Sequence, residues 1–432
     1  MLKPATLLAS LALALSASAE TVVFQNVNVI PMTSDRVLAR QTVVVKDGRI
    51  DYVGTARMKM PEGTKSVDGR GKYLLPGLAE MHGHIPPMNA PVHVIEDVLF
   101  EYVANGITTV RGMLGHPGQL NLRTRAALGE IVSPTLYLAG PSFNGNSINS
   151  PQQAIEKVRQ QKQEGWDLLK IHPGLTRDEY DAMALTARDE KIRFGGHVPA
   201  DVGLLHAIEM GQETFDHVDG YVELLDGDKG PVDEKKLADA VARTKAAGAW
   251  IVPTMALWEV LLDTIDLKTL RAYPELKYVP QSTVDQWTKL YNDRLDQVPR
   301  ATAETIVKNR MRILRALNEG GVKILMGTDA PQQFSVPGFS LHRELERMRD
   351  AGMTPYQILV SGTRNVGEYF KAKDSFGTVE KGKRADLVLV DANPLEDISN
   401  LSKISGVMVR GRWMSRAEID AGLAKIEERY KR

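Results

Sequence analysis

The chain has 432 residues, of which 43% are hydrophobic and 25% are charged, a composition typical of a globular protein with a large core. Its 54 Lys and Arg residues equal its 54 Asp and Glu residues, so no net charge attracts nucleic acid or an anionic membrane surface. The absence of cysteine excludes disulfide bonds, lipid attachment through cysteine and thiolate metal ligands. Any bound metal must therefore be held by nitrogen and oxygen atoms.

The N-terminus carries an apolar run of the length found in signal peptides. After Lys3 and Pro4 comes ATLLASLALALSASA, which is too short to span a bilayer and ends in small residues before Glu20. A basic residue, an apolar centre and a small-residue cleavage site are typical of a secretory signal peptide. We therefore expect residues 1–19 to be removed before Glu20 and the mature protein to be periplasmic or secreted.

Short, glycine-punctuated β-strands are predicted at both ends of the mature chain. The segments with this character are 21–30, 42–54, 377–394 and 407–414. Within the first half, Asp47-Gly48 is a hairpin turn signal. Because the two ends share this pattern of short strands and the middle of the chain has a different pattern, we predict a small β-sandwich domain built from residues 20–76 and 372–414.

Between these ends, eight short apolar runs alternate with segments of mostly helical periodicity. The runs are GLAEMHGHI, GITTVRGM, PTLYLAG, WDLLKIH, IRFGGHV, ETFDHV, AWIVPTM and GVKILMGT, numbered units one to eight. Repeated strand–helix alternation is the signature of an α/β fold of the (β/α)8 TIM-barrel type. We predict that residues 77–371 form this barrel. A terminal helix over 415–432 follows, opened by a capping box at Ser415 and Glu418.

The connection after unit seven is much longer than the other connections. It covers residues 256–318 and is rich in large aromatic residues, namely Trp258, Tyr273, Tyr278, Trp287 and Tyr291. An insertion of this length is either a lid or substrate wall, or a helical pair that packs on the barrel. The sequence leaves both alternatives open.

Six polar side chains that could carry the chemistry fall at the ends of the predicted strands. They are His82, His84, Lys170, His197, His217 and Asp329. Functional groups of a TIM barrel stand at the carboxyl ends of its strands, which share one face. Residues 82 and 84 are two apart on a strand and point the same way, as two ligands of one ion must. Each residue alone is also typical of a core histidine, a salt-bridged lysine or a turn aspartate, but six of them at one end predict a metal site.

This set resembles the amidohydrolase superfamily of metal-dependent hydrolases, in its imidazolonepropionase-like and prolidase-like branch. LLPGLAEMHGHI is similar to that family's first barrel strand, GTDA to its strand-eight aspartate, and GTVEKGKRADLVLVD to its C-terminal sandwich. The resemblance implies two divalent metal ions, zinc first among those that suit nitrogen and oxygen ligands. The ligands it implies are His82, His84 and Asp329 for the more buried ion, His197 and His217 for the more exposed ion, and an N6-carboxylated Lys170 bridging both.

The carboxylated lysine has a physical requirement that stands apart from the resemblance. A lysine ammonium cannot ligate a cation, whereas a carbamate is an anionic donor with two oxygens. Forming the carbamate needs a neutral amine, so burial must lower the pKa of Lys170 well below its reference value of ~10.4.

The reaction implied is hydrolysis of an amide C–N bond in a dipeptide, an N-acyl amino acid or a cyclic amide. Two ions that share a water lower its pKa and make hydroxide available, and we expect Asp329 to pass the proton to the leaving nitrogen. The absence of cysteine and of a Gly-x-Ser-x-Gly elbow argues against an acyl-enzyme. Lactone or ester hydrolysis by the same site is one alternative, and a non-catalytic periplasmic metal- or ligand-binding protein is another.

The expected partner is a small-molecule substrate, with no nucleic acid and, after signal cleavage, no membrane; homo-oligomerisation stays open. Four further residues are candidate substrate contacts: His172, Arg111, Tyr221 and His116. The first of these lies two residues beyond Lys170 and so on the same side of its strand. Arg111, at the end of unit two, is either a carboxylate binder or half of a barrel-end ion pair. The remaining histidines, His93, His206 and His342, are expected to be structural or at the surface.

Overall fold

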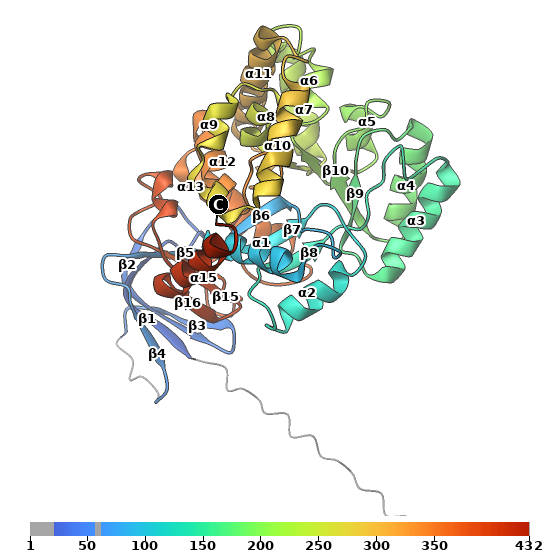
Figure 1. The fold of residues 1–432 in the computed structure, drawn as a ribbon. Coiled ribbons are helices and arrows are strands. Elements are labelled where there is room, and N and C mark those ends of the chain that lie inside the picture. The colour runs from blue at the N-terminus through green and yellow to red at the C-terminus, as the bar shows by residue number, and fades with distance from the viewer. Residues whose placement is uncertain (1–20, 57–61, 432) are drawn as a thin grey trace, which may run out of the picture.

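The computed structural model describes residues 21–56 and 62–431 of the chain. The expected signal peptide over residues 1–19 lies outside these residues. Within the described part of the chain, no helix is both long enough and apolar enough to cross a membrane. The fold is mixed α/β and contains three sheets (Figure 1).

The two ends of the chain meet in one eight-stranded sheet, at the lower left of Figure 1. Its strands are β1 (Val22–Val29), β2 (Leu38–Lys46), β3 (Arg49–Gly54), β4 (Lys65–Asp68), β5 (Tyr73–Pro76), β14 (Leu387–Val390), β15 (Ile404–Val409) and β16 (Arg412–Ser415). The order is β16-β15-β14-β5-β1-β2-β3, and β4 pairs with β1. Antiparallel pairing of β5 with β14 joins the two ends. The predicted hairpin turn is confirmed, since Asp47 and Gly48 have φ of 51° and 73°, both in the left-handed region that a type I′ turn needs.

The terminal sheet has its own apolar core, separate from the core of the central region. Phe24 on β1 meets Trp413 on β16 edge to face, with 5.0 Å between ring centroids. Three strands separate β1 from β16 within the sheet. The sheet therefore brings distant strands together over one shared core.

All eight strands predicted for the middle of the chain are present and parallel. They are β6 (Leu78–Gly83), β7 (Ile107–Gly112), β8 (Thr135–Leu138), β9 (Leu168–Ile171), β10 (Arg193–Gly196), β11 (Thr214–Asp216), β12 (Trp250–Val252) and β13 (Lys323–Ile324). They form two parallel sheets, β6-β7-β8 and β13-β12-β11-β10-β9. Backbone hydrogen bonds link the sheets at both seams, from Phe143 N to Lys170 O and from Met81 N to Met326 O, each 2.8 Å long.

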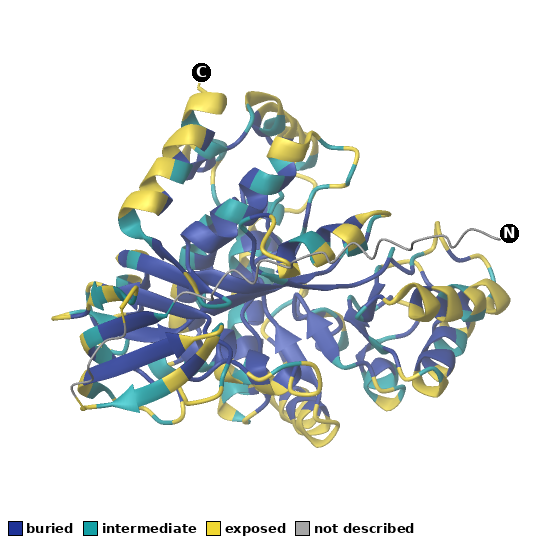
Figure 2. Cartoon of the chain, turned by 90° about the horizontal axis from the view of Figure 1, so that it is seen from below, coloured by how far each residue is buried: buried dark blue, intermediate teal, exposed yellow. Residues whose placement is uncertain are grey.

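Helices surround these strands, with exposed residues on their outer faces and buried ones inside (Figure 2). Before β12 they are α1 (Val92–Ala104), α2 (Gln119–Ala127), α3 (Pro151–Glu164), α4 (Arg177–Asp189), α5 (Leu204–Glu209), α6 (Tyr221–Leu224) and α7 (Glu234–Ala246). After β13 they are α12 (Phe339–Asp350), α13 (Pro355–Gly362), α14 (Arg364–Tyr369), η2 (Ile398–Ser402) and α15 (Arg416–Arg429). Helix α15 begins at the predicted capping box of Ser415 and Glu418 and buries Ile419, Leu423 and Ile426.

The long connection between β12 and β13 forms a helical insertion above the strands in Figure 1. Its elements are α8 (Met255–Leu261), α9 (Leu267–Arg271), η1 (Pro274–Tyr278), α10 (Gln281–Arg294) and α11 (Arg300–Glu319). Trp287 of α10 packs on Phe334 in the loop after β13, with ring centroids 5.7 Å apart. The insertion thus has a core of its own that includes the loop following Asp329. These contacts show that the insertion is packed as a helical unit.

Candidate metal centre

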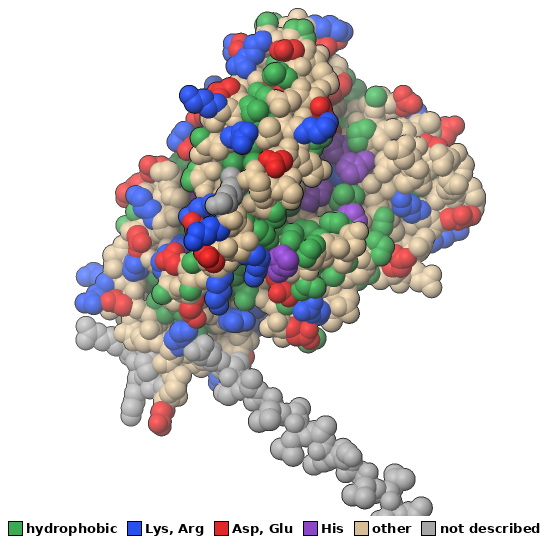
Figure 3. Space-filling model, viewed as in Figure 1, with side chains coloured by type: hydrophobic (Ala, Val, Ile, Leu, Met, Phe, Trp, Pro, Cys, Tyr) green, Lys and Arg blue, Asp and Glu red, His purple; other side chains and the backbone are tan. Residues whose placement is uncertain are grey.

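The six predicted ligands gather where the parallel strands of the central region end. His82 is the second-to-last residue of β6, Lys170 lies on β9, and His217 follows β11 directly. Figure 3 shows histidine side chains grouped in a depression between the helical insertion and the α3–α5 side of the molecule. The sequence spacing and the parallel strand order together produce this arrangement, because parallel strands present their carboxyl ends to one face.

His82 sits at the buried base of the group, with 1% of its surface exposed. Its Nε2 is 3.0 Å from the Nζ of Lys170 and 3.6 Å from the Oδ1 of Asp329. Its Nδ1 is 2.7 Å from the Oδ2 of Asp216, at ion-pair distance but without the alignment of a hydrogen bond. Burial, helped by the nearby Lys170 charge, holds the pKa of His82 well below its usual range. The imidazole is therefore neutral and keeps a lone pair for a ligand.

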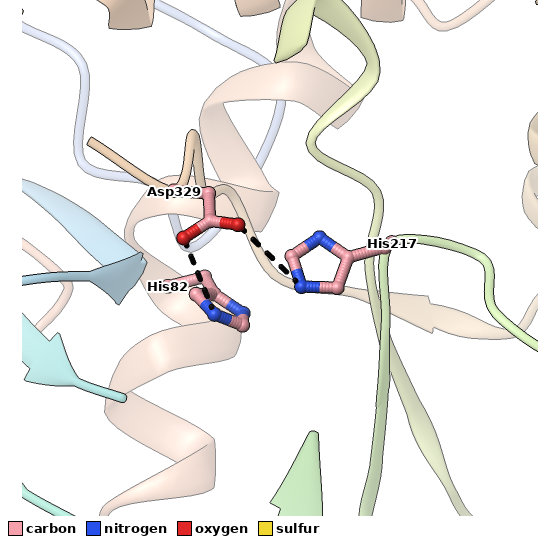
Figure 4. A group of neighbouring side chains, drawn as sticks. All are labelled: His82, His217 and Asp329. Carbon is pink, nitrogen blue, oxygen red and sulfur yellow. Dashed lines mark ion pairs between the residues drawn. The ribbon is translucent and has the colours of Figure 1, made fainter. Parts of the chain in front are cut away.

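His217 and Asp329 face each other across the centre (Figure 4). The Nδ1 of His217 is 2.7 Å from the hydroxyl of Thr254, and its Nε2 is 3.6 Å from the Oδ2 of Asp329. The other oxygen of Asp329 is 2.6 Å from the Nε2 of His84. His217 and Asp329 both adopt left-handed backbone, with φ of 64° and 66°. Such strain in a non-glycine residue costs about 1–3 kcal/mol and is typical of functional sites.

His197 completes the group on its more exposed side. Its Nδ1 is 2.6 Å from the Oδ2 of Asp219, which leaves Nε2 as the available ring nitrogen. Its ring centroid lies 4.5 Å from that of His217 and 5.0 Å from that of His172. The side chain of His197 is 20% exposed, whereas those of His82 and His217 are 1% and 2% exposed. Solvent therefore reaches the site both at His197 and at His84, whose side chain is 19% exposed, while His82 and His217 are buried.

Lys170 is fully buried beneath these histidines. Burial lowers the pKa of its amine to about 8, and the carboxylates of Asp216 and Asp329 oppose part of this effect. A neutral amine is thus far more accessible than for an ordinary lysine. The physical requirement for a carboxylated lysine is met at this position.

The residues present fit a metal ion. Donor atoms of His82, His217 and Asp329 all lie within 4.8 Å of one another. The Nε2 of His217 is buried and has no hydrogen-bond partner among the described residues. An unpaired buried polar atom is unfavourable, and a cation between these donors would satisfy it. The donor set is nitrogen and oxygen only, as zinc, manganese, iron and cobalt accept.

Arg111 and Tyr221, two of the predicted substrate contacts, lie elsewhere. Arg111 is fully buried, and its guanidinium donates to both carboxylate oxygens of Asp216, at 2.9 and 3.1 Å. The barrel-end ion pair is therefore the correct alternative, because no part of the guanidinium reaches solvent. Tyr221 is also fully buried, and its hydroxyl bonds to the hydroxyl of Thr244 on α7. The prediction for Tyr221 is wrong, since its ring belongs to the core behind the site.

His172 and His116 remain near the centre. His172 is half-buried beside His197, and burial lowers its pKa to about 2. His116 is half-buried in the loop after β7, and burial, with a smaller contribution from the nearby His84, lowers its pKa. Of the other histidines, His93 is exposed, and His206 and His342 lie on α5 and α12 with partners outside the centre, as expected.

Several supporting residues were not predicted from the sequence. Asp216 and Asp219 engage the Nδ1 sides of His82 and His197, and Thr254 engages that of His217. Such outer partners fix the ring orientation of metal-binding histidines and raise their affinity. The one local signal was the density of acidic residues in TFDHVDG, where Asp216 and Asp219 flank the candidate ligand His217. Thr254 comes from a different strand and had no sequence signal.

The amidohydrolase family model matches residues 73–414 of this chain. Adenine deaminase 3 of Rhizobium meliloti (strain 1021) is 21% identical over 402 residues, covering 88% of this chain. The chain spans 56% of that relative's length.

Two solved structures share the fold at low sequence identity. A Xaa-Pro dipeptidase with bound methionine has a TM-score of 0.70 and 22% identity, over 92% of this chain and 100% of its own. Bottromycin amidohydrolase has a TM-score of 0.76 and 23% identity, over 95% of this chain and 91% of its own. The family match covers most of the chain and includes all six converging side chains, so the chain belongs to the amidohydrolase family.

Proposed function

We propose that the protein is a metal-dependent hydrolase that cleaves an amide C–N bond in a dipeptide, an N-acyl amino acid or a cyclic amide. The observation that carries the proposal is the union of four histidines, a buried lysine of lowered pKa and Asp329 at one strand end. A protein that only binds a ligand has no need for both Lys170 and Asp329 in that set.

Two divalent ions, zinc in the first instance, would be held by this group. His82, His84 and Asp329 would hold the more buried ion, and His197 and His217 the more exposed one. Lys170, carboxylated on Nζ, would bridge them. With a pKa of about 8, its amine becomes neutral as the pH rises through 8, so carboxylation is favoured on the alkaline side. Bound ions of this kind lower the pKa of water and polarise a carbonyl group.

Asp329 is the proposed proton carrier. Its side chain is only 7% exposed, and its two oxygens face His84 and His217. We assign it to take a proton from the attacking water and deliver it to the leaving nitrogen. His172, neutral because burial lowers its pKa to about 2, would hydrogen-bond the substrate beside His197. His116 would contact the substrate from the opposite loop, near His84.

The architecture proposed around this site is a closed (β/α)8 barrel with a β-sandwich from both chain ends. Backbone hydrogen bonds at both seams between the two parallel sheets support closure. The contact of Phe24 with Trp413 across the terminal sheet supports the sandwich. An enzyme of this family acts on small molecules, and we place this one in the periplasm or the medium on the strength of residues 1–19.

A substrate screen on metal-reconstituted protein tests the proposal. The panel contains dipeptides, N-acyl amino acids and cyclic amides, with lactones and esters as the alternative substrates of the same site. Adenine is included because of the adenine deaminase relative. Metal-dependent amide hydrolysis supports the proposal. Turnover of lactones, esters or adenine without any amide hydrolysis would replace amide hydrolysis by that other reaction as the function of the site. Stoichiometric metal binding with no turnover of any of these would favour the non-catalytic alternative.

A further inference from the structure

A second cavity lies beside the metal centre and contains none of its six ligands. It has a volume of about 310 Å³ and lies between α1, the start of α10 and the end of α15. Two of its walls are Pro86 and Pro331, which follow His84 and Asp329 by two residues each. The cavity is thus on the far side of the loops that carry those ligands. Trp287 of α10 contributes an aromatic wall.

Glu101 on α1 lines this cavity and is 2% exposed. No hydrogen bond or ion pair to its carboxyl group exists among the described residues, and burial raises its pKa well above the usual range. The other buried acids differ. Glu80 accepts hydrogen bonds from the N–H and hydroxyl of Thr328, and Glu344 accepts from the N–H groups of Met255 and Ala256. Glu101 is the exception among the buried Asp and Glu side chains of the described chain.

The surroundings of Glu101 specify the charge of a ligand. Asp97, one helical turn earlier on α1, lines the same cavity but is already paired with Arg429 and Tyr430. No Lys, Arg or His lines the cavity, so an anion would find no counter-charge. The remaining walls are mainly Pro, Val and aromatic side chains. Because burial raises the pKa of Glu101, its carboxyl group ionises only when a cation that carries its own N–H donors pairs with it.

We propose that this cavity binds a small organic cation, a primary ammonium with one apolar substituent, whose N–H groups donate to the carboxylate of Glu101. The apolar substituent lies against the proline, valine and tryptophan walls. The site is independent of the proposed hydrolysis, because no metal ligand lines the cavity. It gives the protein a second small-molecule site within the same fold.

Calorimetric titration of the whole protein with benzylammonium tests the proposal, with two probes of the same ring as controls. Benzyl alcohol lacks the charge and phenylacetate reverses it. All three are titrated into protein stripped of metal, so that coordination of the amine by an ion does not contribute. We expect wild-type protein to bind benzylammonium and to discriminate against both controls. Equal binding of phenylacetate, or no binding of benzylammonium at millimolar concentration, would overturn the proposal without any variant.

Two variants locate the site. Glu101→Gln keeps the shape and removes the charge, and we expect its affinity for benzylammonium to fall about tenfold or more. Glu319→Gln, an exposed residue on α11, serves as the matched control and should bind as wild type does. Val98→Phe fills the cavity from α1 and should abolish binding of the ring itself. Unchanged benzylammonium affinity in both Glu101→Gln and Val98→Phe would show that the ligand binds elsewhere.

Discussion

Arg310 on α11 donates a hydrogen bond from its guanidinium to the backbone carbonyl of His217. The same guanidinium lies 3.5 Å from the ring centroid of Trp258 on α8 and 3.9 Å from the Oδ1 of Asp219. His217 and the following Val218 both have left-handed backbone, with φ of 64° and 57°. Arg310 of the helical insertion therefore stabilises the strained turn at His217, a candidate metal ligand. The insertion thus contributes to the geometry of the site.

Arg310→Met should weaken metal binding as well as the fold. The variant keeps an apolar stem against Trp258 but leaves the His217 carbonyl unpaired, which costs about 1–3 kcal/mol of unfolding free energy. Denaturant unfolding of the metal-free protein measures that loss. Titration of the folded variant with zinc should in addition show a weaker site than in wild type. Arg312→Met, a half-buried neighbour paired with Glu234, is the control and should change neither value appreciably. Loss of stability without any loss of zinc affinity would show that Arg310 supports the fold and not the metal site.

Asp219→Asn should lower metal affinity with little effect on folding. Asp219 engages the Nδ1 of His197 at 2.6 Å, and removing such an outer carboxylate typically weakens a metal site about 10- to 100-fold. Competition with a chromogenic chelator measures the affinity of both ions. Asp226→Asn, on the exposed side of the same region, gives the baseline. Equal affinities in the two variants would remove His197 from the ligand set.

Asp329→Asn should keep the fold and at least one ion but lose turnover. An amide cannot accept the proton that the mechanism assigns to the carboxylate, and general acid–base catalysis contributes about 10²- to 10⁴-fold. The measurement is kcat on any substrate found in the screen, together with metal content and melting temperature. Near-normal kcat in a folded, metal-loaded variant would exclude Asp329 as the proton carrier.

Lys170→Ala should lose the more exposed ion first and with it the activity. The carbamate would supply an anionic ligand to both ions, and its loss leaves the exposed ion with two histidines. A short added carboxylic acid should restore part of the activity by occupying the vacated bridge. Lys170→Arg should recover neither the exposed ion nor the activity, because a guanidinium stays protonated and cannot be carboxylated. Full metal content and rate in Lys170→Arg would contradict the two-ion proposal.

The proposed export of the protein predicts a mature N-terminus at Glu20. Mass spectrometry of the protein from its native host should find this terminus in the periplasmic or extracellular fraction. A soluble cytoplasmic protein that retains Met1 would contradict the signal-peptide interpretation.

The sequence by itself determined the elements and the strand-end positions of the candidate ligands. The strands, the Asp47-Gly48 hairpin and the cap of α15 follow from local periodicity and turn chemistry, which act over a few residues. The positions of His82 and Asp329 follow because each stands directly at the end of a recognisable strand motif. Parallel strands present their carboxyl ends at one face, so these residues come together without any particular packing of the surrounding helices.

Only the tertiary structure decided what each remaining polar residue contacts. In the sequence Arg111 is simply a residue at a strand end, but its partner Asp216 lies on β11, four strands after the β7 strand of Arg111. Tyr221 lies four residues after the candidate ligand His217, yet the left-handed turn at His217 and the first turn of α6 direct its ring into the core. Arg310 lies in α11, a helix of the insertion that carries no recognisable motif, yet its guanidinium donates to the backbone carbonyl of His217. Side-chain partners that are distant in sequence depend on how helices pack on the strands, and no local pattern encodes that packing.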